Sequence, residues 1–332
     1  MRNLITDVPG LTVGNAEDLR LGSGATAIIF DEPAAASVDV RGGGPGTRET
    51  DLLDPERTVP GIDAIVLSGG SAFGLDAASG VQAWLREQDR GFAIGAVRVP
   101  IVSAAVLFDL LSAGDKNWGR FPPYRELGYS AAANAALDFA LGSVGAGTGA
   151  TTVNYKGGLG SASAQSADGL SVGALAAVNA VGSVVVGDGP WFWAAPFEID
   201  GEFGGRGLPD ALSPETLEPL MKGAVRESTT LVAVATDAIL TKAQAKRLAV
   251  MAQSGLARAI YPVHSPLDGD IVFAASTGRR PLADPVRDLA RLGALAANVA
   301  ARAIARGVFA ARALPGAISG DDRPSWSEHF GR

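Results

Sequence analysis

The stretch RESTTLVAVATDA, which runs from Arg226 to Ala238, places a Ser-Thr-Thr triplet directly before an apolar run. Leucine, valine and alanine fill residues 231–235, and such a run is typical of a buried β-strand. Serine and threonine at the entrance of a strand usually form a turn or a cap. By itself the triplet is therefore more typical of a turn or a cap, and only the rest of the sequence can give its hydroxyl groups a chemical role.

Strand and helix patterns alternate on both sides of this run. We expect further strands at 25–30, 37–40, 64–67, 172–178, 182–186 and 271–275, and helices at 72–86, 103–111, 130–141, 241–260 and 286–314. The last two helices carry clear start signals, a capping box at Thr241 and a first-turn proline at Pro285. The arginines of the last helix, among them Arg302 and Arg306, are expected on a solvated face. Because no linker-like segment divides the chain, the pattern predicts one layered α/β or α+β domain.

Charge and residue usage exclude several kinds of chemistry. The net charge of −7 disfavours nucleic acids and anionic membranes as partners, because both attract basic surfaces. The chain has no cysteine and two histidines, His264 and His329, so a thiolate nucleophile and a multi-histidine metal site are excluded. We expect no cofactor and no metal. We also expect a cytoplasmic protein, since the first residues lack the order of a signal peptide and no uninterrupted apolar stretch is long enough to span a bilayer.

Polar residues stand at the ends of several apolar runs. Asn179 ends the run LSVGALAAVN, where its amide could stabilise an oxyanion or satisfy backbone groups. Asp268 and Asp270 stand two apart in PVHSPLDGDIVFA, where they could orient a hydroxyl and an ammonium or form a turn. Tyr155 and Lys156 lie in the Gly-rich segment GAGTGATTVNYKGGLGSAS, which by itself is more typical of a hairpin.

Two further Gly-rich segments, DVRGGGPGTRET (39–50) and SGGSAFGL (68–75), follow strand patterns. Their backbone N–H groups could form a cradle for an anion or a carbonyl oxygen. Neither segment fits a nucleotide-binding motif, so tight backbone packing is the more typical role of these glycines.

Taken in order, these motifs resemble the P1 family (peptidase family S58) of DmpA-type aminopeptidases, β-peptidyl aminopeptidases and nylon-oligomer hydrolases. The resemblance covers nearly the whole chain, and ESTTLVAVATDA and HSPLDGDIVFAASTG are its most specific motifs. It implies an α+β fold, a four-layer αββα sandwich of the DmpA and ornithine acetyltransferase type. It also implies a single catalytic domain, 1–332, that cuts itself into a large chain, 1–228, and a small chain, 229–332.

The resemblance implies a role for each polar candidate. Thr229 matches the nucleophile that cleavage between Ser228 and Thr229 would free, and Asn179 matches the oxyanion residue. Asp268 and Asp270 match the pair that positions the nucleophile and its amine, whereas Tyr155 and Lys156 lie in a segment that supplies further active-site groups. Some relatives have Gly-Asn where this chain has Glu227-Ser228, so Ser228 and Thr230 stay open as alternative first residues.

The chemistry of a freed threonine agrees with these roles. A threonine hydroxyl is a poor nucleophile and needs a base. A free α-amino group has a pKa near ~8, so it is partly neutral at working pH and can act as that base. Acidic neighbours such as Asp268 and Asp270 would raise the pKa of the amine and hold its orientation. The scarcity of histidine is therefore compatible with catalysis.

The resulting hypothesis is a self-processing amidohydrolase or aminopeptidase that cleaves an aminoacyl amide or ester bond. Its substrate would be a small peptide, an amino-acid amide or an ω-amide, and we expect a homo-oligomer of four or more chains. Two alternatives stay open, an acyltransferase of the ornithine acetyltransferase type and a non-catalytic small-molecule-binding protein.

Overall fold

One long strand, β2 (Ser23–Val40), joins two β-sheets in the computed structural model, which describes residues 1–223, 228–314 and 323–331. Residues 25–29 of β2 pair with β4 (Ile62–Ser68), whereas residues 35–40 pair with β11 (Ile271–Arg280). The stretches expected as separate strands at 25–30 and 37–40 are therefore two halves of one strand. Arg226 and Glu227, which precede the Ser-Thr-Thr triplet, lie outside the described residues.

The strands follow the order β3-β7-β4-β2-β11-β10-β9-β8, and β1 also pairs with β2. Two pairs are parallel, β4 with β7 and β10 with β11. The other strands are β1 (Leu11–Asp18), β3 (Gly46–Arg48), β7 (Val102–Val106), β8 (Gly158–Gln165), β9 (Ser171–Asn179) and β10 (Thr229–Ala238), with a separate hairpin of β5 (Phe92–Ile94) and β6 (Val97–Val99). This order places β10, which begins at Thr229 within the triplet, between β9 and β11.

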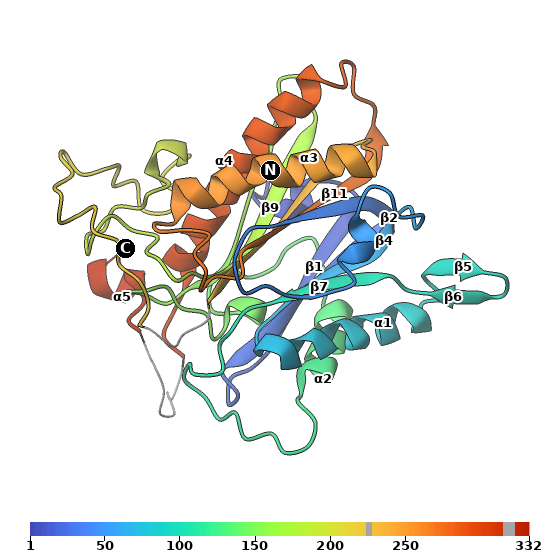
Figure 1. The fold of residues 1–332 in the computed structure, drawn as a ribbon, viewed down its shortest axis with the longest axis horizontal. Coiled ribbons are helices and arrows are strands. Elements are labelled where there is room, and N and C mark those ends of the chain that lie inside the picture. The colour runs from blue at the N-terminus through green and yellow to red at the C-terminus, as the bar shows by residue number, and fades with distance from the viewer. Residues whose placement is uncertain (224–227, 315–322, 332) are drawn as a thin grey trace.

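Helices cover the outer face of each sheet and make four layers (Figure 1). The helices α1 (Ala77–Glu87) and α2 (Tyr124–Ala133) pack on the sheet of β2, β4 and β7, whereas α3 (Lys242–Ala259) and α4 (Arg287–Ala310) pack on the sheet of β9, β10 and β11. Successive residues of β10 alternate between the two sides of its sheet. Leu231 joins the core between the sheets, and Val232 joins the core beneath α3 and α4. The expected α+β fold, an αββα sandwich, is confirmed.

The two longest helices begin where the sequence predicts. Thr241 caps α3, and its Oγ1 accepts a hydrogen bond from the Gln244 N–H at 3.2 Å. α4 follows Pro285 closely and ends at Ala310, before the short helix α5 (Trp326–Phe330). Among the described helices, α4 alone is long and apolar enough to cross a membrane, and 72% of its apolar window is buried in the protein. Such burial is typical of a core helix.

Three local predictions are wrong. The stretch 103–111, expected as a helix, contains β7 instead, because Val102–Val106 is fully buried as the parallel partner of β4. A short run of small apolar residues does not distinguish a buried strand from a helix. The stretch 182–186, expected as a strand, forms isolated bridges, such as Ser183 with Tyr261. The helix expected at 130–141 is α2, which starts earlier and ends at Ala133.

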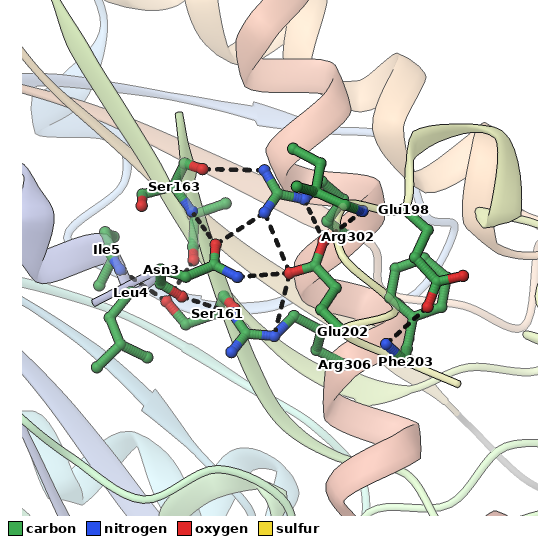
Figure 2. Close-up of polar contacts among 12 residues, drawn as sticks. Asn3, Leu4, Ile5, Ser161, Ser163, Glu198, Glu202, Phe203, Arg302 and Arg306 are labelled. Carbon is green, nitrogen blue, oxygen red and sulfur yellow. Dashed lines mark hydrogen bonds and ion pairs between the residues drawn. The ribbon is translucent and has the colours of Figure 1, made fainter. Parts of the chain in front are cut away.

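A buried ion-pair cluster joins the start of the chain to α4 (Figure 2). Glu202 accepts hydrogen bonds from Arg302 Nε and Asn3 Nδ2, each at 2.5 Å, and its Oε2 lies 3.4 Å from Arg306 Nε. Arg302 also donates to the Ser163 carbonyl at 2.9 Å. The side chains of Arg302 and Glu202 are 4% and 8% exposed, so the expectation of a solvated arginine face is wrong for this part of α4.

Candidate active site

Three neighbouring strands bring the predicted site residues together. Thr229 opens β10 and lies in register with Asn179, the last residue of β9. On the other side of β10, the segment that carries Asp268 and Asp270 leads into β11. Ser228 forms a parallel bridge with Asp268. Residues that are far apart in the sequence therefore meet around Thr229 because their strands are adjacent in one sheet.

The peptide bond between Ser228 and Thr229 is held on two sides. The Thr229 Oγ1 donates to the Ser228 carbonyl oxygen at 2.6 Å, and the Gly269 N–H donates to the same oxygen at 2.8 Å. Gly269 has no room for a side chain, because a Cβ there would lie 2.6 Å from Thr229 Oγ1 and 2.7 Å from the Gly44 carbonyl oxygen. The hydroxyl thus lies beside a carbonyl whose oxygen already has a fixed N–H donor, an arrangement that stabilises negative charge on that oxygen.

The Asn179 side chain is buried and held at both of its polar atoms. Its Oδ1 accepts hydrogen bonds from the Thr151 N–H at 3.0 Å and from Lys222 Nζ at 3.3 Å. Its Nδ2 donates to the Phe108 carbonyl at 2.9 Å. Because an amide nitrogen carries two hydrogens, Nδ2 keeps a second donor for another acceptor.

Asp268 and Asp270 are both buried, and in the uncut chain they bind neighbouring groups rather than solvent. Asp268 accepts from the Val181 N–H and from Ser265 Oγ, each at 3.1 Å. Asp270 accepts from the Thr230 N–H at 2.9 Å and lies 3.0 Å from His264 Nδ1. Burial, together with the nearby Asp270 charge, raises the pKa of Asp268 to about 7.

A cavity of about 180 Å³ opens beside Thr229. Both Gly-rich strand exits contribute to its wall, through Gly44 to Gly46 and through Ser71 to Leu75, and Phe108 lies beside them. All the described lining residues are uncharged. The two Gly-rich segments therefore pack around an uncharged cavity. This agrees with tight backbone packing, the role that the sequence favoured over nucleotide binding.

The buried carboxylate of Asp109 supports one wall of this cavity. Its Oδ1 accepts from the Gly70 N–H at 2.7 Å, and its Oδ2 accepts from Ser23 Oγ at 2.6 Å. Gly70 has φ +83°, a left-handed conformation that favours glycine. Asp109 thus holds the backbone turn that presents Ser71 to the cavity.

The Tyr155 side chain packs beside α5, and the next residue, Lys156, is buried. The Tyr155 ring packs against His329 and Phe330 of α5, with centroid distances of 5.7 and 5.6 Å, and burial raises its pKa to about 12. The Lys156 N–H donates to the Pro324 carbonyl at 3.0 Å. Their segment reaches Asn179 through Thr151, whose N–H binds the amide.

Lys222 was not predicted as a site residue. Its ammonium is buried and donates to the Thr151 carbonyl at 2.7 Å as well as to Asn179. In the sequence it is one lysine in an irregular, polar region, and no motif or period sets it apart. Only the folded chain brings it to the end of β9.

The fold is an αββα sandwich in which Thr229 opens the central strand β10. The chain belongs to peptidase family S58, whose family model matches residues 3–320, and it is accordingly a hydrolase of the aminopeptidase and amidase type.

Relatives agree with this membership, and a solved structure shares the fold. An "uncharacterized aminopeptidase" of Mycobacterium tuberculosis is 42% identical over 95% of this chain and 96% of its own length. A 6-aminohexanoate-oligomer endohydrolase of Kocuria sp. is 29% identical over 82% of this chain and 74% of its own length. The L-aminopeptidase D-Ala-esterase/amidase from Ochrobactrum anthropi has a similar fold, with a TM-score of 0.70, 22% identity and coverage of 100% of this chain and 95% of that chain.

Proposed function

We propose that this hydrolase processes itself between Ser228 and Thr229 and then uses the freed Thr229 as its nucleophile. The observation that carries the proposal is the Ser228 carbonyl oxygen, which lies 2.6 Å from Thr229 Oγ1 and accepts the Gly269 N–H at 2.8 Å. The products would be a large chain, 1–228, and a small chain, 229–332.

Self-cleavage begins when Thr229 Oγ1 attacks the carbonyl carbon of Ser228. The Gly269 N–H stabilises the negative charge that forms on the carbonyl oxygen. The C–N bond then breaks, the nitrogen takes the hydroxyl proton, and an ester joins Ser228 to Oγ1. Water hydrolyses this ester, which restores the hydroxyl and leaves a carboxylate on Ser228 and a free amine on Thr229.

Turnover repeats the same chemistry on a substrate amide. The Thr229 amine accepts the Oγ1 proton, Oγ1 attacks the substrate carbonyl, and the second hydrogen of Asn179 Nδ2 stabilises the oxyanion. The leaving amine takes a proton, and water then hydrolyses the acyl ester. Asp268 and Asp270 would keep the Thr229 amine oriented and raise its pKa.

The substrate is a small peptide, an amino-acid amide or an ω-amide. The cavity of about 180 Å³ has an uncharged lining and therefore favours a small acyl group whose side chain is uncharged. For comparison, a cavity of ~150 Å³ in another protein holds benzene. The names of the relatives, an aminopeptidase and a 6-aminohexanoate-oligomer endohydrolase, support an amide as the bond that is cut.

Intact mass and N-terminal sequencing of purified, active protein test self-processing. We expect a 228-residue chain and a second chain formed by the remaining 104 of the 332 residues, about 23 and 11 kDa of the 33.7 kDa total in proportion to length. The small chain should begin Thr-Thr-Leu-Val. An active preparation that contains only the full-length chain would refute the proposal, and a start at Ser228 or Thr230 would move the nucleophile to that residue.

Asn179→Ala should lower kcat by about 10²–10³ if its amide stabilises the oxyanion. Asn179→Asp should be at least as damaging, because it places a carboxylate beside a developing negative charge. Steady-state kinetics on the cleaved variants measure the effect, with circular dichroism as the control for folding. Near-normal kcat in both variants would make Asn179 a structural amide.

Asp268→Asn and Asp270→Asn should impair turnover and shift its pH profile. Loss of a carboxylate lowers the pKa of the Thr229 amine, so the neutral amine persists to lower pH and the acidic limb of kcat/KM moves down. We would measure kcat/KM of the cleaved variants from about pH 5 to 9. This range includes the unperturbed pKa of an α-amine. If both carboxylates serve only a turn, asparagine replaces them equally well and both curves match the wild type.

We also propose a cytoplasmic homo-oligomer of four or more chains. The β5–β6 hairpin supports the oligomer, because it extends from the body of the fold (Figure 1) and exposes Ile94 and Val97 by 62% and 60%. Ile94→Asp combined with Val97→Asp should shift the particle to a smaller mass in light scattering. An unchanged mass would exclude the hairpin as a subunit contact.

A further inference from the structure

The Asn179 amide at the end of β9 is held in its orientation by residues outside that strand, one of which is the cation Lys222. Two donors converge on its Oδ1, the Thr151 N–H at 3.0 Å and Lys222 Nζ at 3.3 Å. Lys222 Nζ also donates to the Thr151 carbonyl at 2.7 Å, so the same ammonium binds both the Asn179 side chain and the Thr151 backbone. With Oδ1 held in this way, Nδ2 is directed towards Phe108, a residue that lines the cavity beside Thr229.

The ammonium acts on the amide through charge as well as through geometry. A hydrogen bond from a cation to an amide oxygen draws electron density from the amide nitrogen, and this makes its N–H a stronger donor. Lys222 is 5% exposed, so solvent screens its charge weakly. Burial and the Asp270 charge raise the pKa of Asp268, whereas the Lys222 ammonium lowers it, so the charge of Lys222 acts on Asp268 as well.

Lys222 has an anchor of its own on the large-chain side of the cleavage point. Its N–H donates to the Val181 carbonyl at 3.1 Å, and the Val181 N–H binds Asp268 Oδ1 at 3.1 Å. These two bonds hold the Lys222 backbone beside Val181, two residues after Asn179.

We infer that Lys222 is a positioning residue of the mature site: the ammonium near the end of the large chain fixes and polarises the Asn179 amide for the oxyanion. The inference rests on the proposed function of Asn179 and adds a residue from the segment that self-cleavage would turn into a chain end.

A double-mutant cycle with Asn179 tests the inference. Lys222→Met should lower kcat by roughly 10- to 100-fold per cleaved site and leave KM within about twofold, because the oxyanion exists only during the reaction. Lys222→Met combined with Asn179→Ala should be no slower than Asn179→Ala alone, because the lysine acts through the amide. Rates are normalised to the amount of small chain with a free Thr229.

A second lysine provides a matched control. Lys242 Nζ also donates to backbone carbonyls, those of Leu52, Arg57 and Val59, at 2.8, 3.1 and 3.3 Å. Lys242→Met should leave kcat unchanged. Normal kcat in Lys222→Met, or a double variant whose loss is the product of the two single losses, overturns the inference.

A further pair of variants applies if Lys222→Met gives no cleaved protein. Lys222→Arg keeps the charge and Lys222→Gln keeps only a neutral donor, so the arginine variant should exceed the glutamine variant about tenfold in kcat. Equal values refute the role of the charge. Failure of the proposed function is a separate result, because it appears as a wild-type chain that stays uncut or as activity that survives Thr229→Ala.

Discussion

Thr229→Ala is expected to leave the chain uncut and to lower kcat by about 10⁴-fold or more, because the proposed self-cleavage and the proposed turnover use the same hydroxyl. Thr229→Ser should keep part of both reactions, since its oxygen remains. Denaturing electrophoresis reports cleavage, and hydrolysis of an aminoacyl amide reports turnover. The alanine variant should fold, because the change removes one small group at a buried position.

A second pair of variants tests whether the space around the Thr229 hydroxyl matters when the hydroxyl itself is kept. Gly269→Ala would place a Cβ 2.6 Å from Thr229 Oγ1, so it should slow self-cleavage while the threonine itself is intact. Gly44→Ala, in the wall of the same cavity, adds a Cβ whose nearest neighbour lies 3.8 Å away, so it serves as the control for the rate of self-cleavage. Substantial hydrolysis by Thr229→Ala would remove Thr229 from the role of nucleophile.

Glu202→Ala is expected to lower the free energy of unfolding by about 3–5 kcal/mol, because it leaves the buried Arg302 guanidinium without its anionic partner. The side chains of Arg302 and Glu202 are 4% and 8% exposed, and Arg306 lies 3.4 Å from the same carboxylate. Urea denaturation of the uncut Thr229→Ala chain measures the loss as a shift of the midpoint at constant slope.

The exposed ion pair of Asp168 and Arg291 provides the control for this experiment. Its atoms lie 3.1 Å apart, but its side chains are 60% and 62% exposed. Asp168→Ala should therefore cost at most about 1 kcal/mol. An equal, small loss for Glu202→Ala would mean that the buried cluster contributes little to stability. In cleaved protein the same substitution would also weaken the association of the two chains, since Glu202 and Arg302 lie on opposite sides of the cleavage point.

Patterns that depend on neighbouring residues were predicted well from the sequence. The alternation in β10, the capping box of α3 and the proline before α4 are local signals, and each element is present. The order of motifs along the chain also predicted the αββα fold and the meeting of Thr229 with Asn179, because that order resembles a family whose fold is known.

Patterns that depend on partners far away in the sequence could not be predicted in the same way. The stretch 103–111 has a composition that suits a helix as well as a strand, and only the pairing of β7 with β4 decides between them. In the sequence, nothing distinguishes Arg302 from the solvated arginines of the same helix. Only the fold places Glu202 and Asn3 beside it.

The sequence by itself determined the hydroxyl, amide and carboxylate groups of the candidate site and the strands that carry them, because residue type and local period are properties of adjacent residues. The tertiary structure alone decided which charges are buried and what they face. Lys222 shows the difference: its ammonium lies 3.3 Å from Asn179 Oδ1, although 43 residues separate the two in the chain. A buried charge is stable only beside a partner, and that partner exists only once the strands have assembled.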